Sequence, residues 1–472
     1  MTYIKPIYII IFMMTVASFA QSETKKSYSL DDCITTAITN NLDLKSAQLV
    51  ANDAKVDFKQ AKANLLPTLN ANYNIGVNNG RSIDPFTNDF IDQKLTFSNA
   101  GLSLDMTVFN GFNLLNTLKQ NQLNKQASEM EYEAAKQDLV LNVTLAYLQV
   151  LNAKAVLQLA NSQLEATKKQ VEIQKGFYEN EAGNPADYTD ILGQQSNDET
   201  NVLTAKNNLE NAKLSLKLLL NLDTPTTFEV NELLLDVKGY SLSAEEIFNK
   251  SLQNFAAFEA QELRTEAAKK GISVAKSQYT PTISFFGQLN TNYSSAAETF
   301  SATGTSIEET GDFVTIDNQQ YSVFTESTLF DAESITYSNQ FENNLNSVAG
   351  IAVSVPIFNG FSAKNNVAIQ KIVHEESLLE LERNHQEIKN AITQVHFSME
   401  AAYKRYQSFL DQVEAYTESY RINEIRFNNG VSNFLNYITS KNNLDNAKIN
   451  LANAKYEYLL RVKILDYYGG LN

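Results

Sequence analysis

The chain has 472 residues, of which 43% are hydrophobic and 19% are charged, and its formal net charge is -16 at pH 7. This acidic balance argues against a nucleic-acid partner, because binding to phosphates requires an excess of Lys and Arg. The single cysteine, Cys33, excludes a disulfide framework within the chain. Cys33 also lies too far downstream of the N-terminal segment to be lipidated at a cleavage site there.

The N-terminal segment predicts export. Residues 1–20 contain Lys5, an apolar run and small residues before Gln21, which is the pattern of a secretory signal peptide. A membrane anchor is the alternative interpretation, but the run is shorter than the roughly 20 residues that a spanning helix needs. We expect no later segment to approach a membrane-spanning helix in length or apolarity. A membrane location would therefore require a β-barrel, the other fold that satisfies its backbone in lipid.

The same motifs occur twice in the same order. FNGF stands at residues 109–112 and again at 358–361. LLPTLNANYN and YTPTISFFGQ precede the two copies, and TAKNNLENAK and NAKINLANAK follow them. Duplication of one long unit is indicated, rather than a solenoid of short repeats. We expect a first repeat over residues 21–242 and a second over residues 243–472.

Four segments alternate between apolar and polar residues and predict strands at about 68–79, 95–109, 281–293 and 345–357. Their length suits tilted transmembrane strands, although a half-buried strand of a soluble sheet has the same alternation. Four strands cannot close a membrane barrel, which needs about eight, so closure would require several chains. The residues expected to face lipid in that case are Leu69, Tyr73, Leu104, Met106, Phe285 and Val353.

Two stretches, from Phe112 to Lys175 and from Phe361 to Asn429, contain no glycine or proline and predict very long helices. In the first stretch an apolar residue recurs every seven positions, which indicates a left-handed supercoil against neighbouring helices. The members of this seam are Val143, Val150, Leu157, Leu164 and Val171. Gly183 and Gly430 mark turns after which the chain returns, so helical hairpins are expected at about 112–221 and 361–468.

Polar loops are expected to join the strands of each pair. The second loop, from Ser294 to Gln340, has eight acidic residues and no Lys or Arg. We interpret it as a solvated surface loop that faces the outside.

The complete pattern resembles the TolC family of outer-membrane efflux proteins. The resemblance is carried by SVPIFNGF, TAKNNLENAKLSL, FLNYITSKNNLDNAKINLANAKYEYLL and NLLPTLNANYN, and it covers essentially the whole mature chain. It implies a mainly α-helical fold with a membrane β-barrel, in which each chain of a homotrimer gives four strands and long coiled-coil helical hairpins with a two-fold internal repeat. The implied location is the outer membrane with a long periplasmic extension. The implied partners are outer-membrane lipid, a periplasmic adaptor protein and an inner-membrane pump.

The resemblance also implies roles for two sets of residues. FNGF would lie where the second strand of each pair turns into a long helix. Gly111 and Gly360 would permit the bend, and the phenylalanines would either pack the junction or lie at the membrane interface. These phenylalanines are Phe109, Phe112, Phe358 and Phe361.

The two helix-end turns would meet the adaptor and close the pore in such a protein. The candidate residues are Gly183, Asp187, Thr189 and Asp190 in the first turn, and Phe427, Gly430, Asn433, Asn436 and Thr439 in the second. Some relatives carry aspartates at the positions of Asn436 and Thr439, so an acidic gate there is in doubt. Asp187 and Asp190 would be the remaining source of negative charge. Phe427 matches a gate aromatic of relatives, and packing is the alternative role.

No catalytic pattern stands out. His374, His385 and His396 are eleven residues apart and share a helix face, but successive ones are about 16 Å apart, too far for one metal site. We find no phosphate-binding glycine loop or nucleophile triad and expect no cofactor, no metal and no enzyme activity. The predicted function is a passive outer-membrane exit duct of a tripartite efflux or type I secretion system, opened by an adaptor and a pump. The alternative is an exported coiled-coil spacer without transport activity.

Overall fold

The computed structural model describes residues 26–83, 88, 90–92, 94–181, 184–223, 228–233 and 236–470. The expected signal peptide at 1–20 and the turn residue Gly183 lie outside these residues. The chain forms two compact units, of which the first comprises Met1–Val50, Glu129–Glu259 and Arg383–Asn472, and the second comprises Ala51–Ser128 and Ala260–Glu382. Each unit therefore contains parts of both sequence repeats.

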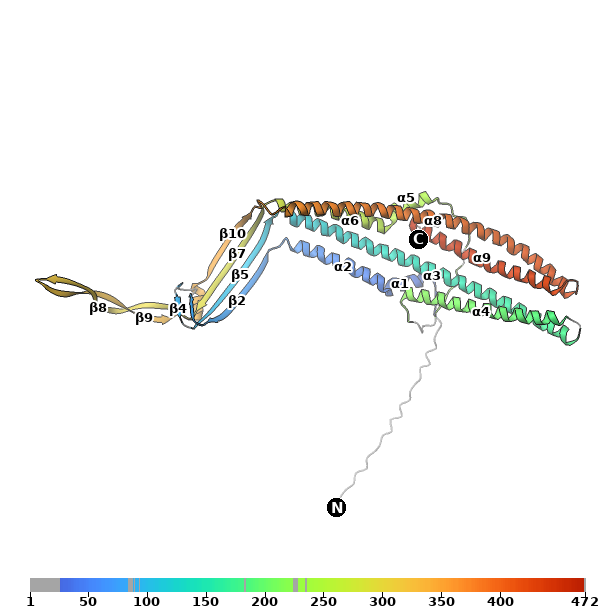
Figure 1. Cartoon of the computed structure of the whole chain (residues 1–472), viewed down its shortest axis with the longest axis horizontal. Coiled ribbons are helices and arrows are strands. Elements are labelled where there is room, and N and C mark those ends of the chain that lie inside the picture. Colours follow the sequence, from blue (N-terminus) through green and yellow to red (C-terminus); the bar gives the residue numbers. More distant parts are fainter. Residues whose placement is uncertain are drawn as a thin grey trace, which may run out of the picture. The chain divides into compact units, whose positions relative to one another are not determined.

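The order of elements repeats along the chain (Figure 1). The first half contains β1 (Lys26–Tyr28), α1 (Leu30–Asn40), α2 (Leu42–Ala63), β2 (Thr68–Asn78), β3 (Arg81–Ile83), β4 (Phe90–Asp92), β5 (Leu95–Phe109), α3 (Asn113–Glu179), α4 (Pro185–Leu220) and β6 (Phe228–Val230). The second half contains α5 (Ala244–Asn254), α6 (Ala256–Lys276), a 3-10 turn (Ser277–Tyr279), β7 (Thr282–Ser294), β8 (Glu298–Ile316), β9 (Gln319–Ser334), α7 (Tyr337–Asn343), β10 (Asn346–Ser354), α8 (Ser362–Asn428) and α9 (Phe434–Gly469). Helices α3 and α8 have 67 residues each, and α4 and α9 have 36 each, which confirms the two-fold repeat.

The second unit contains a four-stranded antiparallel sheet in the order β10-β7-β5-β2. Strands β5 and β7 come from different repeats and pair in the middle, where Leu102 faces Leu289. The outer edges of β2 and β10 have no partner strand among the described residues. The four strands and two-fold repeat of the predicted fold are thus confirmed.

The strand register places the apolar residues on one face, because directly opposed residues of an antiparallel pair lie on the same side of the sheet. Leu69 faces Leu104, and Met106 faces Phe285. We call this side the apolar face, and it consists mainly of Leu69, Tyr73, Ile75, Leu102, Leu104, Met106, Phe285, Leu289, Ile351 and Val353. Its outer members are largely exposed, as Leu69 at 62% and Ile351 at 70% show.

The opposite side of the sheet is the polar face. It carries Asn70, Asn72, Asn74, Asn99, Ser103, Gln288 and Asn290. Two aromatic rings lie among these amides: Phe97 covers Gly76, and Phe286 covers Gly350. A Cβ atom at either glycine would stand 2.7 Å from the ring above it, so both glycines make room for an aromatic side chain.

The first unit contains most of the two helical hairpins, from Glu129 of α3 and Arg383 of α8 onward, and its core follows the predicted seven-residue seam. Val143 and Val150 are fully buried, and Leu164 and Val171 are nearly so. Val143 and Val150 pack with Leu209, Leu216 and Leu220 of α4. Val171 packs with Ile191 of α4 and with Phe434 and Tyr437 of α9. The coiled-coil prediction is confirmed.

The prediction that no later segment has the length and apolarity of a membrane-spanning helix was wrong. Helix α3 contains a stretch that is long and apolar enough to cross a membrane by length and composition, and 44% of that stretch is buried within the protein. The apolarity comes from seam residues such as Val143 and Tyr147, which pack against other helices. A core helix satisfies the same test, so this stretch is weak evidence for a membrane span.

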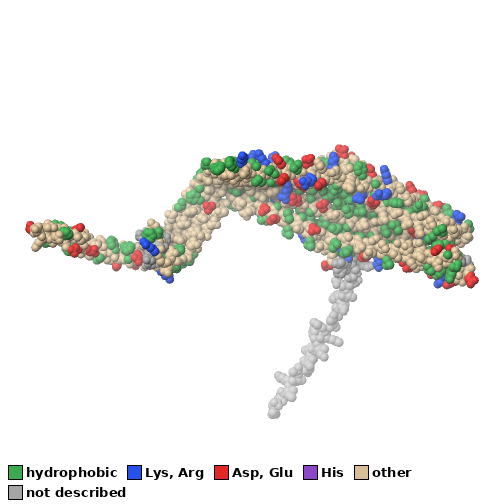
Figure 2. Space-filling model, in the orientation of Figure 1, with side chains coloured by type: hydrophobic (Ala, Val, Ile, Leu, Met, Phe, Trp, Pro, Cys, Tyr) green, Lys and Arg blue, Asp and Glu red, His purple; other side chains and the backbone are tan. Residues whose placement is uncertain are grey.

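The interpretation of Ser294–Gln340 as a loop was also wrong. Strands β8 and β9 form a long antiparallel hairpin, and α7 follows it. Asp317 and Asn318 connect the strands with φ angles of 50° and 63°, as a two-residue hairpin turn requires. The visible side of the hairpin shows acidic and hydrophobic side chains (Figure 2). Its Thr, Phe, Val and Ile residues favour strands, whereas its eight acidic residues led to the prediction of a solvated loop.

Candidate functional site: strand-helix junctions and helix-end turns

Both FNGF motifs form the same turn between a strand and a long helix. The φ angles are 66° at Gly111 and 61° at Phe112, and 62° at both Gly360 and Phe361. Two consecutive left-handed residues reverse the extended chain into the helix, and glycine adopts the first of them without steric penalty. The helix then begins at once: the N–H of Asn113 donates to the carbonyl of Asn110 at 3.2 Å, and the second copy repeats this bond at the same distance.

The phenylalanines of each motif pack against each other. The rings of Phe109 and Phe112 lie edge to face at 5.4 Å and 87°, and those of Phe358 and Phe361 at 5.6 Å and 87°. This geometry is a favourable aromatic pairing. Phe112, Phe358 and Phe361 nevertheless remain 60% or more exposed. Packing is therefore one role of these residues, and their contact with a membrane interface stays a prediction.

The surroundings of the two glycines differ. A Cβ atom at Gly111 would stand 1.7 Å from Oγ1 of Thr280 and 3.0 Å from the carbonyl oxygen of Ser277. At Gly360 no heavy atom of the described residues, its two chain neighbours aside, lies within 4 Å of the corresponding position. A polar cavity of about 430 Å³ lies beside these junctions and is lined by both motif asparagines, Asn110 and Asn359, among other Ser, Thr and Asn residues.

The first helix-end turn connects α3 to α4 and is capped by Asn184. The side-chain oxygen of Asn184 accepts from the N–H of Ala186 at 3.1 Å, and its amide donates to Asp187 at 3.3 Å. Burial and the nearby charge of Asp190 raise the pKa of Asp187, and the bond from Asn184 partly offsets this. Thr189 and Asp190 are exposed, and the Thr189 hydroxyl donates back to the carbonyl of Ala186 at 2.9 Å.

The second turn connects α8 to α9 around Gly430, whose φ is 70°. Asn433 caps α9, because its side-chain oxygen accepts from the N–H of Asn436 at 3.0 Å. Phe427 stacks on Tyr437 at 4.9 Å and 20°, and it lies 5.9 Å from the ring of Phe434. Phe434 and Tyr437 are buried, so Phe427 packs in this structure.

The two turns lie together at one end of the first unit (Figure 1). Val171 and Ile191 from the first hairpin share a hydrophobic cluster with Phe434 and Tyr437 from the second. Asn436 and Thr439 are exposed instead, one helical turn apart on α9. The structure thus brings the predicted residues of both turns to the same end. Uncharged side chains, Asn436 and Thr439, are exposed at the two positions where some relatives would carry aspartates.

Sequence reasoning missed a buried ionic cluster between the two hairpins. Lys441 of α9 lies 2.8 Å from a carboxylate oxygen of Asp445 and 3.5 Å from one of Asp198 on α4, and the Lys441 and Asp198 side chains are 3% and 5% exposed. Thr167 of α3 donates to Asp198 at 2.5 Å, and Gln194 donates to it at 2.7 Å. A signal was available, because Asp198 occupies an apolar-seam position seven residues before Ala205.

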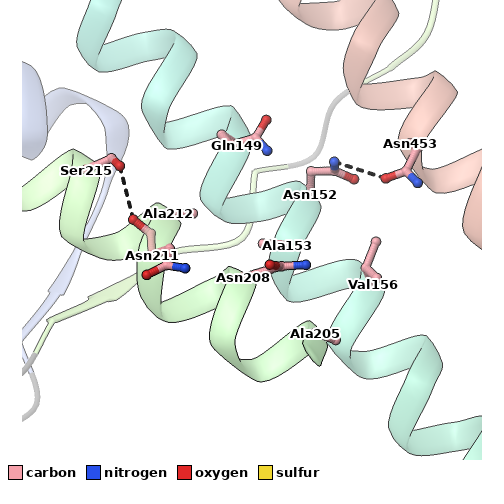
Figure 3. Close-up of a pocket in the computed structure, with 10 residues that line it drawn as sticks. All are labelled: Gln149, Asn152, Ala153, Val156, Ala205, Asn208, Asn211, Ala212, Ser215 and Asn453. Atoms are coloured by element: carbon pink, nitrogen blue, oxygen red, sulfur yellow. Dashed lines mark hydrogen bonds between the residues drawn. The ribbon is translucent and has the colours of Figure 1, made fainter. Parts of the chain in front are cut away.

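A second polar feature is a pocket of about 430 Å³ between α3, α4 and α9 (Figure 3). The amide of Asn152 donates to Asn453 across it at 3.2 Å. Its other polar lining residues are Gln149, Asn208, Asn211 and Ser215. Amide groups donate and accept hydrogen bonds but carry no charge and do not act as acids or bases near neutral pH. The pocket therefore offers neutral hydrogen-bonding groups.

The three histidines do not converge. His396 contacts the carbonyl of Leu242 at 3.1 Å, and His385 packs edge-on against Phe258 with 4.8 Å between ring centroids. Neither these nor other described His, Cys, Asp and Glu residues form a group of three that could hold a metal ion. Cys33 is fully buried, and burial raises the pKa of its thiol to about 12.

Comparisons with known proteins identify the architecture. The family model described as outer membrane efflux protein matches residues 33–222 and 247–468. The outer membrane protein TolC of Escherichia coli is 22% identical over 445 residues, covering 92% of this chain and 80% of TolC, and the toxin and drug export protein A of Aggregatibacter actinomycetemcomitans is 23% identical over 447 residues, covering 92% and 84%. The crystal structure of the Campylobacter jejuni CmeC outer membrane channel has a TM-score of 0.74 and 18% identity, covering 93% of this chain and 85% of that one.

Proposed function

Because the chain belongs to the outer membrane efflux protein family, we propose that it forms the passive outer-membrane exit duct of a tripartite efflux or type I secretion system. The protein lies in the outer membrane, and its long helices extend into the periplasm. The observation that carries the proposal is the four-stranded sheet with an exposed apolar face, an amide-rich polar face and two unpaired edges.

The sheet supports assembly of several chains around one pore. Four strands are too few for a membrane barrel, and the unpaired backbone groups of β2 and β10 would be costly in lipid. These two edge strands run in opposite directions, because each neighbouring pair between them is antiparallel. The β10 edge of one copy therefore matches the β2 edge of the next in antiparallel pairing. A homotrimer would supply four strands from each copy, with the apolar face toward lipid and the amides toward water.

The proposed duct conducts solutes without chemistry of its own. Its polar face offers neutral amides and hydroxyls, which would discriminate cargo mainly by size and charge. Energy would come from an inner-membrane pump, and an adaptor protein would contact the helix-end turns around Asn184 and Gly430. Opening would separate the two turns, so the shared cluster of Phe434, Tyr437 and Ile191 would have to rearrange.

The test compares two adjacent positions at the middle of β5. Leu102 lies on the apolar face and Ser103 on the polar face. An arginine facing lipid near the bilayer centre costs about 2–4 kcal/mol, whereas a pore-facing arginine costs little. We expect Leu102→Arg to reduce the amount of assembled protein in outer membranes and Ser103→Arg to preserve it while changing conductance in planar bilayers.

The mass of the detergent-extracted protein, from light scattering that subtracts bound detergent, gives the number of chains. A trimer that forms conducting pores supports the duct. A soluble monomer that binds no detergent, with equal behaviour of both arginine variants, would leave the exported coiled-coil spacer as the better explanation.

A further inference from the structure

Helix α7 lies on the apolar face of the sheet near the end that is remote from the long helices. Its first residue, Tyr337, has its hydroxyl 3.1 Å from that of Tyr73 and accepts a hydrogen bond from Ser98 at 3.0 Å. The Tyr337 ring lies 4.8 Å from the ring of Tyr293 and stacks on that of Phe341 at 4.4 Å. Tyr73, Ser98 and Tyr293 all belong to the apolar face by strand register.

Side-chain hydrogen bonds fix α7 to the end of β7. Gln340 is 1% exposed, and it accepts from the N–H of Ser294 and donates to the carbonyl of Ser294, both at 2.9 Å. Thr291 donates to the carbonyl of Phe341 at 2.7 Å, and Asn344 donates to that of Asn292 at 2.9 Å. The hydrogen bonds of Gln340, Thr291 and Asn344 therefore hold α7 in a defined position on the sheet.

The position of α7 matches one boundary of a lipid bilayer. Ser98 lies under Tyr337, and Phe109 of the first FNGF motif stands eleven residues further along β5. Eleven residues span about 36 Å along a strand. With the tilt of about 40° that is usual in membrane barrels, the height is about 28 Å, close to the apolar band of about 25 Å. The interval between α7 and the junction phenylalanines is thus one hydrocarbon thickness.

The chemistry of α7 suits the lipid head-group region. Tyrosine rings have an apolar body and a hydroxyl at one end, which favours the boundary between acyl chains and water. No Lys or Arg occurs from residue 277 to residue 363, so α7 and its flanks offer lipid phosphates no cation of their own. The Tyr73 and Tyr337 hydroxyls are hydrogen-bonded to each other, which leaves one of their two protons for an ester or head-group oxygen. Ring contacts to the upper acyl chains supply the other attractive interaction. Leu345, 57% exposed just after α7, adds apolar surface.

We propose that Tyr73, Tyr293, Tyr337 and Phe341 form an aromatic collar through which α7 binds lipid head groups at the outer interface of the membrane. The collar rests on the proposed membrane role of the sheet. It assigns a lipid-binding function to residues 337–343, of which the predicted solvated loop, Ser294 to Gln340, would place the first four in water.

The chain contains no tryptophan, so a single introduced tryptophan reports its own depth. Phe341→Trp probes the collar, Phe285→Trp probes the middle of the apolar face, and Phe330→Trp probes the exposed β9 strand. Leu345→Trp is a second collar probe whose exposed site tolerates the larger ring. Each full-length variant is reconstituted in phosphatidylcholine vesicles whose acyl chains carry bromine either near the head group or near the methyl end, and tryptophan emission is measured.

We expect bromine near the head group to quench the two collar probes most strongly and bromine deep in the acyl chains to quench Phe285→Trp, with Phe330→Trp keeping its emission in both. Collar probes that keep their emission while Phe285→Trp is quenched would overturn the collar alone. Collar probes quenched most by deep bromine would also overturn it. Loss of quenching at Phe285→Trp as well would overturn the membrane role of the sheet.

Discussion

Replacement of Gly111 with alanine is expected to destabilise the protein more than the same replacement at Gly360. Both glycines have φ angles above 60°, where an L-residue pays about 1 kcal/mol relative to glycine. At Gly111 the new methyl group would also stand 1.7 Å from Oγ1 of Thr280. That hydroxyl donates to the carbonyl of Ser277 at 2.6 Å, so moving it sacrifices a hydrogen bond worth about 1 kcal/mol.

The remaining contacts at Gly111 add to this cost. The Thr280 Cβ would be 2.9 Å away and the Ser277 carbonyl 3.0 Å away, and neither is the free end of a flexible side chain. We therefore expect Gly111→Ala to cost about 3–5 kcal/mol, from the conformational, hydrogen-bond and overpacking contributions together, and Gly360→Ala about 1 kcal/mol.

Urea unfolding of both variants in the same detergent measures the difference, provided the two transitions keep the same slope. Thr280→Ala serves as a control, because it removes Oγ1. The double variant with Gly111→Ala should then show a favourable coupling in a double-mutant cycle. Equal losses at Gly111 and Gly360, with no coupling to Thr280, would refute the steric argument and leave the φ angle as the only constraint.

Three further predictions concern the helical unit. Lys441→Met leaves Asp198 buried without its cation and is expected to lower the free energy of unfolding by about 3 kcal/mol. The double variant with Asp198→Asn should recover much of this loss in a thermal unfolding measurement. A double variant no more stable than Lys441→Met alone would contradict the pairing. The pKa of Asp187 is raised in the folded state, so the fold disfavours its charged form. Asp187→Asn should therefore raise the melting temperature slightly near neutral pH. The difference in melting temperature between variant and parent should disappear as the pH falls through the folded-state pKa of Asp187. Cys33, with its pKa raised to about 12, should resist maleimide at pH 8 until urea unfolds the protein, and rapid labelling of the folded chain would show that α1 opens.

The strands and long helices were predictable because each has a period that burial enforces. The alternation around Tyr73 sets one face of β2, and the seven-residue spacing from Val143 sets the seam of α3. Five shorter helices of the described residues, α1, α2, α5, α6 and α7, were missed, although two of them begin at a recognisable start signal. Ser29 with Asp32 and Ser243 with Glu246 form capping boxes at α1 and α5, and a serine followed three residues later by an acid is a known helix-start pattern.

Other features depend on tertiary contacts that a sequence does not display. Asp198 stands out at a seam position, but its partner Lys441 is 243 positions away on another hairpin. The packing of α4 against α9 selects this partner, and no local pattern does. The same holds for α7, where Gln340 reaches back to Ser294 across the whole β8–β9 hairpin.

The repeated FNGF shows how one sequence can serve the same backbone in different surroundings. Both copies place two left-handed residues before a helix of 67 residues and pair their phenylalanines at 87°. Gly111 lies against Thr280 and Ser277, but Gly360 has open space around it. The need shared by both copies is therefore the left-handed turn, which explains the motif at each site. Close packing constrains the first copy only, so a duplicated motif does not imply duplicated neighbours.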